Sequence, residues 1–306
     1  MASPPAAADL RRRLRGVMVP LVTPFTAALT IDWPAFDAHV ARLLASGISV
    51  FIPADLVGEA WALSRDEKAR LFEQTVRLVG GRATVVAKLS GPEVAGVSWL
   101  AAAAATAGVQ AIKVPVPAAP AAPTAVEDHV EAAVAASGLP FLLETAGEGV
   151  PLALLDHLTG RPDLVGIEET SLDLDRFDIL IERYGARIPV IAGSEDVLGF
   201  TLLLGAAGLM TATPNFAPAY MDALWAAGAA TDAVRTFGLF RRLRRYRRLF
   251  DAELRAGTPS FASYTKAALE LLGHPVGPAR PPLRPLTAGE REALRATLRD
   301  SLGLAT

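Results

Sequence analysis

The segment Leu164-Val165-Gly166-Ile167-Glu168-Glu169-Thr170-Ser171 places two carboxylates directly after a short apolar run. The apolar run predicts a buried β-strand. The polar residues that follow it then lie at the carboxyl end of the strand, where α/β proteins bind their ligands. Glu168 and Glu169 are therefore candidate site residues. A structural interpretation stays open, because the residues after them are also good caps for a following helix.

Seven further apolar runs flank this segment along the chain. The eight runs begin near Gly16, Ser49, Thr84, Ala111, Pro140, Leu164, Pro189 and Gly208. Helical patterns lie between them at residues 33–46, 64–79, 94–107, 124–137, 151–158, 174–184 and 197–204. Several of these begin with a capping box or end at a glycine. Strands that alternate with helices in this way predict an α/β fold, a parallel (β/α)8 TIM barrel.

After Ala212 the pattern changes to helices alone, at residues 218–228, 231–256, 260–272 and 287–302. They predict a C-terminal helical appendage. We therefore expect three parts: a loose N-terminal arm over residues 1–15, the barrel over residues 16–216, and a helical region over residues 217–306 that closes and extends the barrel.

Composition narrows the class of partner. The 306 residues include 30 basic and 32 acidic side chains, and a net charge of -2 offers no footprint for nucleic acid or an anionic membrane. The uncharged stretch 197–221 is broken by glycines and prolines, which argues against a membrane span. The chain has no cysteine, which excludes thiolate ligands and is compatible with a cytoplasmic location. A small-molecule substrate is the partner we expect.

One arginine-rich stretch has an ordinary structural interpretation, and the common cofactor and metal motifs are missing from the sequence. Residues 240–250 contain six arginines, but apolar residues at helical spacing in the same stretch favour an amphipathic helix with a basic face towards solvent or another subunit. No glycine-rich phosphate loop follows a strand, and no histidine pair has metal-ligand spacing. We therefore expect no cofactor and no metal.

Charged residues also lie in or at the ends of three other predicted strands. Lys88 ends the run 84–88, Lys113 lies within 111–115, and Glu144 lies near the end of the run that begins at Pro140. An ammonium facing the helix layer would be buried in hydrocarbon, so we expect both lysines to point into the barrel. Glu144 and Glu168 should face each other from neighbouring strands about 5 Å apart. One of two such carboxylates is expected to have a raised pKa and to act as general acid while the other acts as base.

Five stretches, in order, resemble the dihydrodipicolinate synthase and N-acetylneuraminate lyase superfamily of class I aldolases. They read GVMVPLVTPF at 16–25, GEA at 58–60 followed by ALSRDE at 62–67, GIEET at 166–170, AGSED at 192–196, and PNFAP at 214–218. The similarity runs from Arg15 to the last helix. It implies the barrel with its C-terminal helices, and a homo-oligomer, commonly a dimer or tetramer.

The same resemblance implies an altered site. The Schiff-base lysine of the family falls on Glu168, and a carboxylate cannot form an imine. The threonines that hold the substrate carboxylate in the family fall on Leu56 and Val57, and its proton-shuttling tyrosine falls on Glu144. The tyrosine from the neighbouring subunit falls near residues 116–118, and the arginine for a second carboxylate has no counterpart in 146–149. The candidate substrate-binding residues are Leu56, Val57, Glu59, Val116, Glu169 and Glu195.

Several functions stay open from the sequence. The favoured one is a lyase or isomerase that acts on a small oxygenated substrate by Glu144/Glu168 acid-base chemistry, with Lys88 or Lys113 stabilising an oxyanion. Either lysine is also a candidate for a relocated Schiff base. Glu144, Glu168 and Glu195 or Asp196 would be the ligands of a metal-assisted lyase. The last alternatives are a catalytically silent relative that binds a ligand less polar than pyruvate, and lysine–glutamate pairs that only tie the strands together.

Overall fold

Eight parallel strands close into a barrel in the computed structural model, which describes residues 7–90, 94–116, 123–145, 150–258 and 260–306. The strands pair in chain order, and β8 pairs with β1 to complete the ring. Their bounds are β1 Gly16–Pro20, β2 Val50–Ile52, β3 Thr84–Lys88, β4 Ala111–Pro115, β5 Phe141–Thr145, β6 Leu164–Glu169, β7 Val190–Ala192 and β8 Gly208–Met210. The (β/α)8 barrel predicted from the sequence is confirmed, with every strand within one residue of its expected start.

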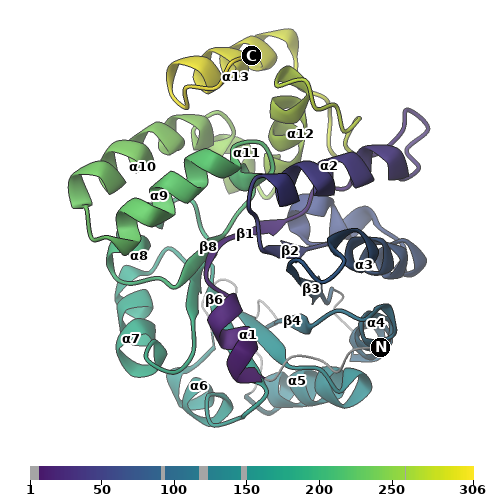
Figure 1. The fold of residues 1–306 in the computed structure, drawn as a ribbon, viewed down its shortest axis with the longest axis vertical. Helices are drawn as coiled ribbons and strands as arrows, with labels where there is room; N and C mark the ends of the chain where they lie inside the picture. Colours follow the sequence, from purple (N-terminus) through teal and green to yellow (C-terminus); the bar gives the residue numbers. More distant parts are fainter. Residues whose placement is uncertain (1–6, 91–93, 117–122, 146–149, 259) are drawn as a thin grey trace.

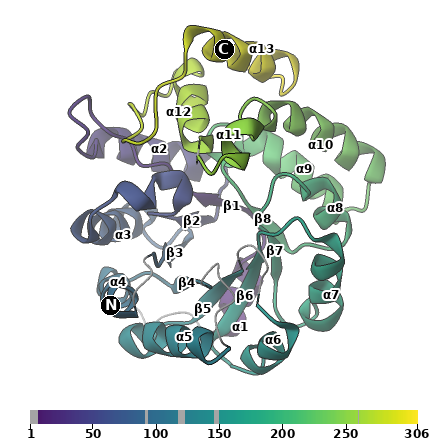
Figure 2. The same ribbon diagram turned by 180° about the vertical axis from the view of Figure 1, so that it is seen from behind.

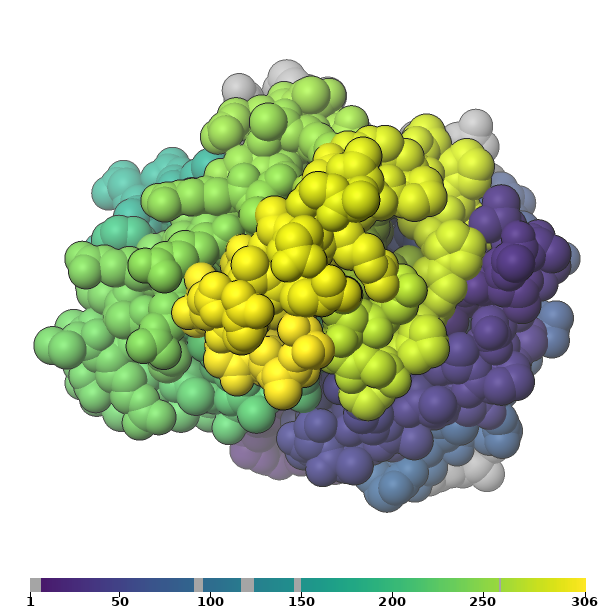
Figure 3. All heavy atoms as spheres, turned by 90° about the horizontal axis from the view of Figure 1, so that it is seen from above, coloured from purple at the N-terminus to yellow at the C-terminus, as the bar shows by residue number. Residues whose placement is uncertain are grey.

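Helices surround the barrel and continue beyond it (Figure 1). The barrel helices are α2 Trp33–Ala45, α3 Arg65–Val79, α4 Val94–Ala107, α5 Pro123–Ser137, α6 Leu152–Leu158, α7 Leu174–Tyr184 and α8 Leu198–Leu203. The C-terminal helices are α9 Pro218–Ala229, α10 Ala233–Arg247, α11 Asp251–Arg255, α12 Phe261–Leu271 and α13 Ala288–Asp300. In Figure 3 the yellow C-terminal segment lies over the green helices that precede it. Within the described residues, no helix combines the length and apolarity needed to cross a lipid bilayer.

The single helix predicted over residues 231–256 is two helices in the structure. α10 ends at Arg247, and α11 begins at Asp251 after a turn through Phe250. The turn buries Phe250, whose ring lies 5.2 Å from that of Tyr246 and 4.8 Å from that of Tyr264. Burial of one large aromatic side chain contributes about 1.5–3 kcal/mol, so this packing gives a physical reason for the break in the helix.

The amino end of the barrel is closed by a helix that the sequence analysis did not predict. A loose arm is expected there, but residues Ala7–Arg13 form α1, which lies across the barrel opening in Figure 1. Leu10 and Leu14 are fully buried against barrel residues such as Met18 and Val50. Arg11 fixes the helix through its guanidinium, which donates to the Leu164 carbonyl at 3.0 and 2.7 Å. The segment is ordered because it covers the apolar bottom of the barrel.

Asn215 connects the turn after the last barrel strand, β8, to the end of the first, β1. Its Nδ2 donates to the carbonyls of Pro20 and Ala212, both at 2.9 Å. Its Oδ1 accepts from the Val22 amide at 3.1 Å and from Nε2 of His39 at 2.9 Å. Burial lowers the pKa of His39 to about 3, so the ring is neutral, with Nε2 protonated as this donor role requires. The turn after β8 is thereby fixed to the end of β1.

We expect Asn215→Ala to lower the free energy of unfolding by at least about 3 kcal/mol, because several buried backbone groups and His39 lose their partners at once. Urea unfolding followed by circular dichroism measures the loss. Gln74→Ala is the matched control, since it removes a half-buried amide from the surface of α3. A loss for Asn215→Ala no larger than that for Gln74→Ala would contradict a structural role for this amide.

Candidate functional site

A pocket of about 340 Å³ opens at the carboxyl ends of the strands, the end of the barrel that faces the viewer in Figure 2. Its size lies at the lower end of the range for small-molecule sites, which is about 300–1,000 Å³. Six of the residues predicted from the sequence line it: Leu56, Val57, Lys113, Glu144, Glu168 and Glu195. Residues from the C-terminal region, among them Arg247 of α10 and Phe261 of α12, complete the wall. The C-terminal appendage is therefore part of the pocket wall.

Lys113 lies at the centre of the charged groups. Its Nζ is 2.6 Å from a carboxylate oxygen of Glu168, 2.7 Å from one of Asp55 and 3.7 Å from one of Glu144. The side chain is almost completely buried, and Nζ also contacts the Met210 sulfur at 3.4 Å. Because β5 and β6 pair with Glu144 opposite Glu168, both carboxylates reach the same ammonium. Glu144 and Glu168, expected to face each other, thus both lie beside Lys113, one of the two lysines expected to point into the barrel.

The titration of this cluster is set by a competition between burial and charge. Burial alone lowers the pKa of Lys113, but attraction to Asp55 and Glu168 outweighs it and raises that pKa, so Lys113 is charged. Burial, together with repulsion from Asp55, raises the pKa of Glu168 in spite of Lys113. For Asp55 burial works in the same upward direction, yet Lys113 and Lys88 hold its pKa below the usual value. Asp55 and Glu168 therefore differ in their tendency to carry a proton.

Lys88 has a different environment. It is buried and forms an ion pair with Glu144, but it is absent from the pocket wall. Burial, with repulsion from the charged Lys113, lowers its pKa to about 7. A large fraction of Lys88 is therefore neutral amine at neutral pH.

Asp55 was not among the predicted site residues. It follows the end of β2 and caps the short 3-10 turn η1, Leu56–Gly58, by accepting from the Leu56 amide at 2.5 Å. An acid directly after a short buried strand is the signal that identified Glu168, so the same reasoning applied to residues 50–55 would have found Asp55.

Gly193 gives Glu168 its space. A Cβ atom at this position would lie 2.8 Å from Oε1 of Glu168 and 2.6 Å from the methyl carbon of Thr170. These contacts are closer than packed atoms tolerate, so any side chain here would displace the Glu168 carboxylate. Gly193 therefore shapes the pocket without contributing a functional group.

Glu169 faces away from the pocket. Its side chain is fully buried, pairs with Nε of Arg176 at 2.7 Å and accepts from the Ser171 amide at 2.9 Å. Neighbouring residues of a strand point to opposite faces, so Glu168 and Glu169 cannot both enter the barrel. Instead, Glu169 joins β6 to the start of α7.

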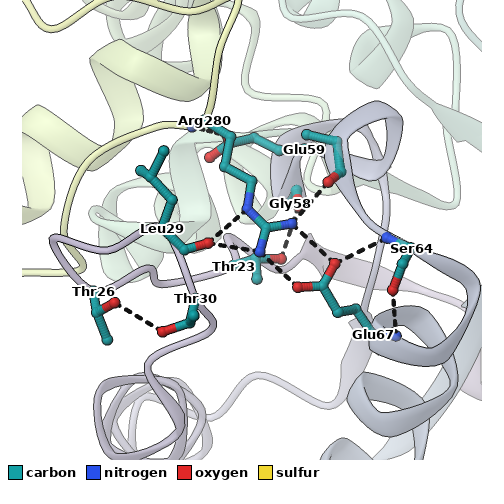
Figure 4. A network of polar contacts seen from close by, with 10 residues as sticks. Thr23, Thr26, Leu29, Thr30, Gly58, Glu59, Ser64, Glu67 and Arg280 are labelled. Atoms are coloured by element: carbon teal, nitrogen blue, oxygen red, sulfur yellow. Dashed lines mark hydrogen bonds and ion pairs between the residues drawn. The ribbon is translucent and has the colours of Figure 1, made fainter.

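Glu59, also predicted as a substrate-binding residue, is held outside the pocket by the C-terminal region (Figure 4). One carboxylate oxygen lies 2.5 Å from Nζ of Lys266, and the other accepts from the Arg280 amide at 2.6 Å. The Arg280 guanidinium in turn forms two bonds to Glu67, at 2.9 and 2.6 Å. Lys266 and Arg280 each lie 4.2 Å from the centre of the Phe25 ring. This set of contacts, which we call the Glu59 network, fixes the turn after β2.

The remaining predicted positions are outside the pocket or outside the described residues. Val116 is buried and is absent from the pocket wall. Its neighbours at 117–118, and the segment 146–149, lie outside the residues that the structure describes. The side chain of Leu56, in contrast, is about half exposed at the mouth of the pocket.

The arrangement of carboxylates suits an ammonium better than a metal ion. Over the described ranges, no group of three or more histidine, aspartate or glutamate side chains has the geometry of a metal site. Asp55 and Glu168 both direct an oxygen at Lys113, whose Nζ occupies the space between them. A cation in this position already compensates their charge.

The fold and pocket together define a (β/α)8-barrel protein with a pocket at the carboxyl ends of its strands. The chain belongs to the Dihydrodipicolinate synthetase family, whose sequence model matches residues 13–301. It is 30% identical over 298 residues to an uncharacterised DapA-like lyase of Halobacterium salinarum, with 95% of each chain covered. It is 28% identical over 291 residues to the 4-hydroxy-tetrahydrodipicolinate synthase of Moorella thermoacetica, with 93% of this chain and 97% of that one covered. Its relatives are thus lyases and synthases.

Solved structures agree with the fold. The YagE protein of Escherichia coli K12, described in complex with pyruvate, is 25% identical, has a TM-score of 0.86, and is matched over 95% of this chain and 99% of its own. Dihydrodipicolinate synthase from Oceanobacillus iheyensis has a TM-score of 0.87 at 24% identity, with 96% of this chain and 98% of that one covered. At 24% identity, the similarity to the Oceanobacillus iheyensis structure establishes the fold alone.

Proposed function

We propose that this chain is an aldolase-like lyase or isomerase that acts on a small oxo or hydroxy compound through the acid-base chemistry of two carboxylates. The observation that carries the proposal is the convergence of Glu144 and Glu168 on the Lys113 ammonium in the wall of a pocket. The raised pKa of Glu168 suits a general acid, and Glu144 is then the base.

The roles follow from the charges. Glu144 removes a proton from the carbon next to a carbonyl, and the electron pair moves to the carbonyl oxygen. The ammonium of Lys113 stabilises the negative charge on that oxygen, because it is charged and shielded from water. Glu168 then donates a proton to the product. Lys113 is a poor nucleophile in this setting, since its protonated nitrogen has no free electron pair.

A second mechanism is favoured by one observation. The pKa of Lys88, lowered to about 7, makes a neutral amine available for a Schiff base with a carbonyl substrate. The family relation, and the complex of the YagE protein with pyruvate, make small 2-oxo acids the first carbonyl compounds to try. Against this mechanism, Lys88 is absent from the pocket wall and pairs with Glu144.

A silent binding protein is the remaining alternative, supported by the apolar Leu56 and Val57 at the mouth. Hydrogen–deuterium exchange distinguishes it from an enzyme without knowledge of the physiological substrate. We expect the wild-type protein to exchange the protons next to the carbonyl of at least one short oxo acid or ketone in deuterium oxide, as seen by proton NMR. No exchange with any member of the panel would count against the proposed function.

Borohydride trapping then separates the two mechanisms. We expect no adduct by intact mass for the carbonyl compound that exchanges, because the proposed chemistry forms no imine. Lys88→Met is the matched variant. An adduct in the wild-type protein that disappears in Lys88→Met would replace the acid-base mechanism by a relocated Schiff base.

A further inference from the structure

Arg247 presents a buried guanidinium to the pocket. It lies at the end of α10, lines the pocket, and is only 9% exposed. Asp196 binds two of its three nitrogens: Nη2 at 2.8 Å and Nε at 3.4 Å. The guanidinium carbon lies 4.9 Å from the centre of the Phe250 ring. In the part of the chain that the structure describes, Nη1 has no hydrogen-bond partner, so an oriented donor remains for a ligand.

Thr211 supplies an independent indication on the same side of the mouth. It follows β8, lines the pocket and is 5% exposed. Its Oγ1 is buried, and no hydrogen-bond partner for it exists among the described residues. A buried hydroxyl without a partner is uncommon in native proteins, because each such group carries a free-energy cost. A ligand in the pocket would give it one.

The charged residues beside Arg247 limit the kind of anion that can bind there. Asp196 already shares the charge of Arg247 and also pairs with Arg244, one turn earlier on α10. Glu195 lines the pocket too, with one oxygen accepting from the Thr213 amide at 3.0 Å. A dianionic phosphate would meet repulsion from these acids, whereas a single carboxylate matches the remaining donors. Leu56 and Val57, which follow β2 and also line the pocket, present apolar side chains instead.

We infer that Arg247 and Thr211 form a subsite for the carboxylate of the substrate. The subsite lies beside β8 and α10, so the substrate carries its carboxylate on this side while its oxo or hydroxy group meets Lys113. The placement of the oxo or hydroxy group at Lys113 rests on the proposed function. The carboxylate subsite concerns binding alone. The ligand class is therefore an oxo or hydroxy acid held by its carboxylate at Arg247.

Calorimetric titration of matched ligand pairs tests the subsite without any turnover. The probes are pyruvate and 4-oxopentanoate, each beside its neutral primary amide, with inorganic phosphate as a further probe. For the wild-type protein we expect one of the acids to bind about ten- to a hundredfold more tightly than its amide, the size of a charge-assisted hydrogen bond. Arg247→Met is expected to abolish this preference. Arg244→Met is the matched control, because it removes the other partner of Asp196 and is not part of the pocket wall.

The outcomes are distinct. Equal preference for the acid in wild-type and Arg247→Met proteins would overturn the inference, as would an equal loss in Arg244→Met. Tighter binding of phosphate than of both acids, or no saturable binding of either acid in the millimolar range, would also overturn it. The preference is expected to persist in Glu144→Gln, so a failure of the proposed catalysis leaves this result unchanged.

Discussion

Glu168→Gln is expected to lower the rate of proton exchange by about one hundred- to ten-thousandfold, the usual contribution of a general acid or base. Glutamine keeps the size of the side chain and its place beside Lys113, but it cannot donate and regain a proton. The measurement is the exchange rate of the most active carbonyl compound, followed by proton NMR across a range of pH. The fold should survive, since Asp55 still pairs with Lys113.

Glu169→Gln is the control for this prediction. It makes the same chemical change at the next residue of β6, where the side chain pairs with Arg176 outside the pocket. We expect exchange by this variant to stay within about threefold of wild type, with its folded state checked by thermal unfolding. The acid-base mechanism would be wrong if Glu168→Gln kept its exchange rate, or if both variants lost it equally.

Lys113→Met is expected to lower the free energy of unfolding by about 3–5 kcal/mol at neutral pH, because it leaves Asp55 and Glu168 without the cation between them. In the wild-type protein burial opposes the charge of Asp55, but Lys113 keeps its pKa below the value of 3.8 for an unperturbed group. The stability that ionised Asp55 contributes to the folded wild-type protein is thus present above that pH and is lost as the pH falls. Without Lys113, only Lys88 and the Leu56 amide oppose the effect of burial, so the pKa of Asp55 in the folded state rises. The deficit of the variant should therefore shrink at acid pH and grow as the carboxylates ionise.

Lys88→Met provides the comparison of opposite sign. The pKa of Lys88 is lowered by burial from 10.5 to about 7, so the wild-type protein gains stability from this group as the pH rises through that window. The cost of the buried charge is fully present below about pH 7. At pH values just below 7 we expect Lys88→Met to lose less stability than Lys113→Met, because Lys113 still lies 3.7 Å from Glu144, and to lack the rise above it. Equal losses in the two methionine variants would refute the difference between these lysines.

The sequence predicted most of the architecture because strand and helix patterns alternate clearly from Gly16 to Ala212. It also led us to expect that Glu144 and Glu168 face each other and that Lys88 and Lys113 point into the barrel, since neighbouring parallel strands bring their carboxyl ends to one edge. Arg247 could not be assigned to the pocket in this way. Its position depends on how α10 packs over the barrel. Residues 240–250 contain six arginines, and nothing in the sequence indicates which of them lines the pocket.

The helix α1 was not predicted from the sequence either, because it also depends on packing against the barrel. Its residues carry only a short helical pattern, and isolated helices of this length are marginal in water. Leu10 is buried because it packs against apolar residues at the amino end of the barrel. Glu59 and Glu169 show the opposite case, since both look like site residues in the sequence while their partners, Lys266 and Arg176, hold them outside the pocket.

The Glu59 network has a consequence for how this protein can change in evolution. Glu59 has a left-handed backbone, with φ of 60°, and ends the same short turn that Asp55 begins. Lys266 and Arg280 hold one end of that turn from the C-terminal region, and Asp55 at the other end holds Lys113 in the barrel. The tail and the barrel are consequently not independent modules. A replacement of the C-terminal region that removed Lys266 and Arg280 would leave Glu59 without these partners at the turn from which Asp55 reaches Lys113.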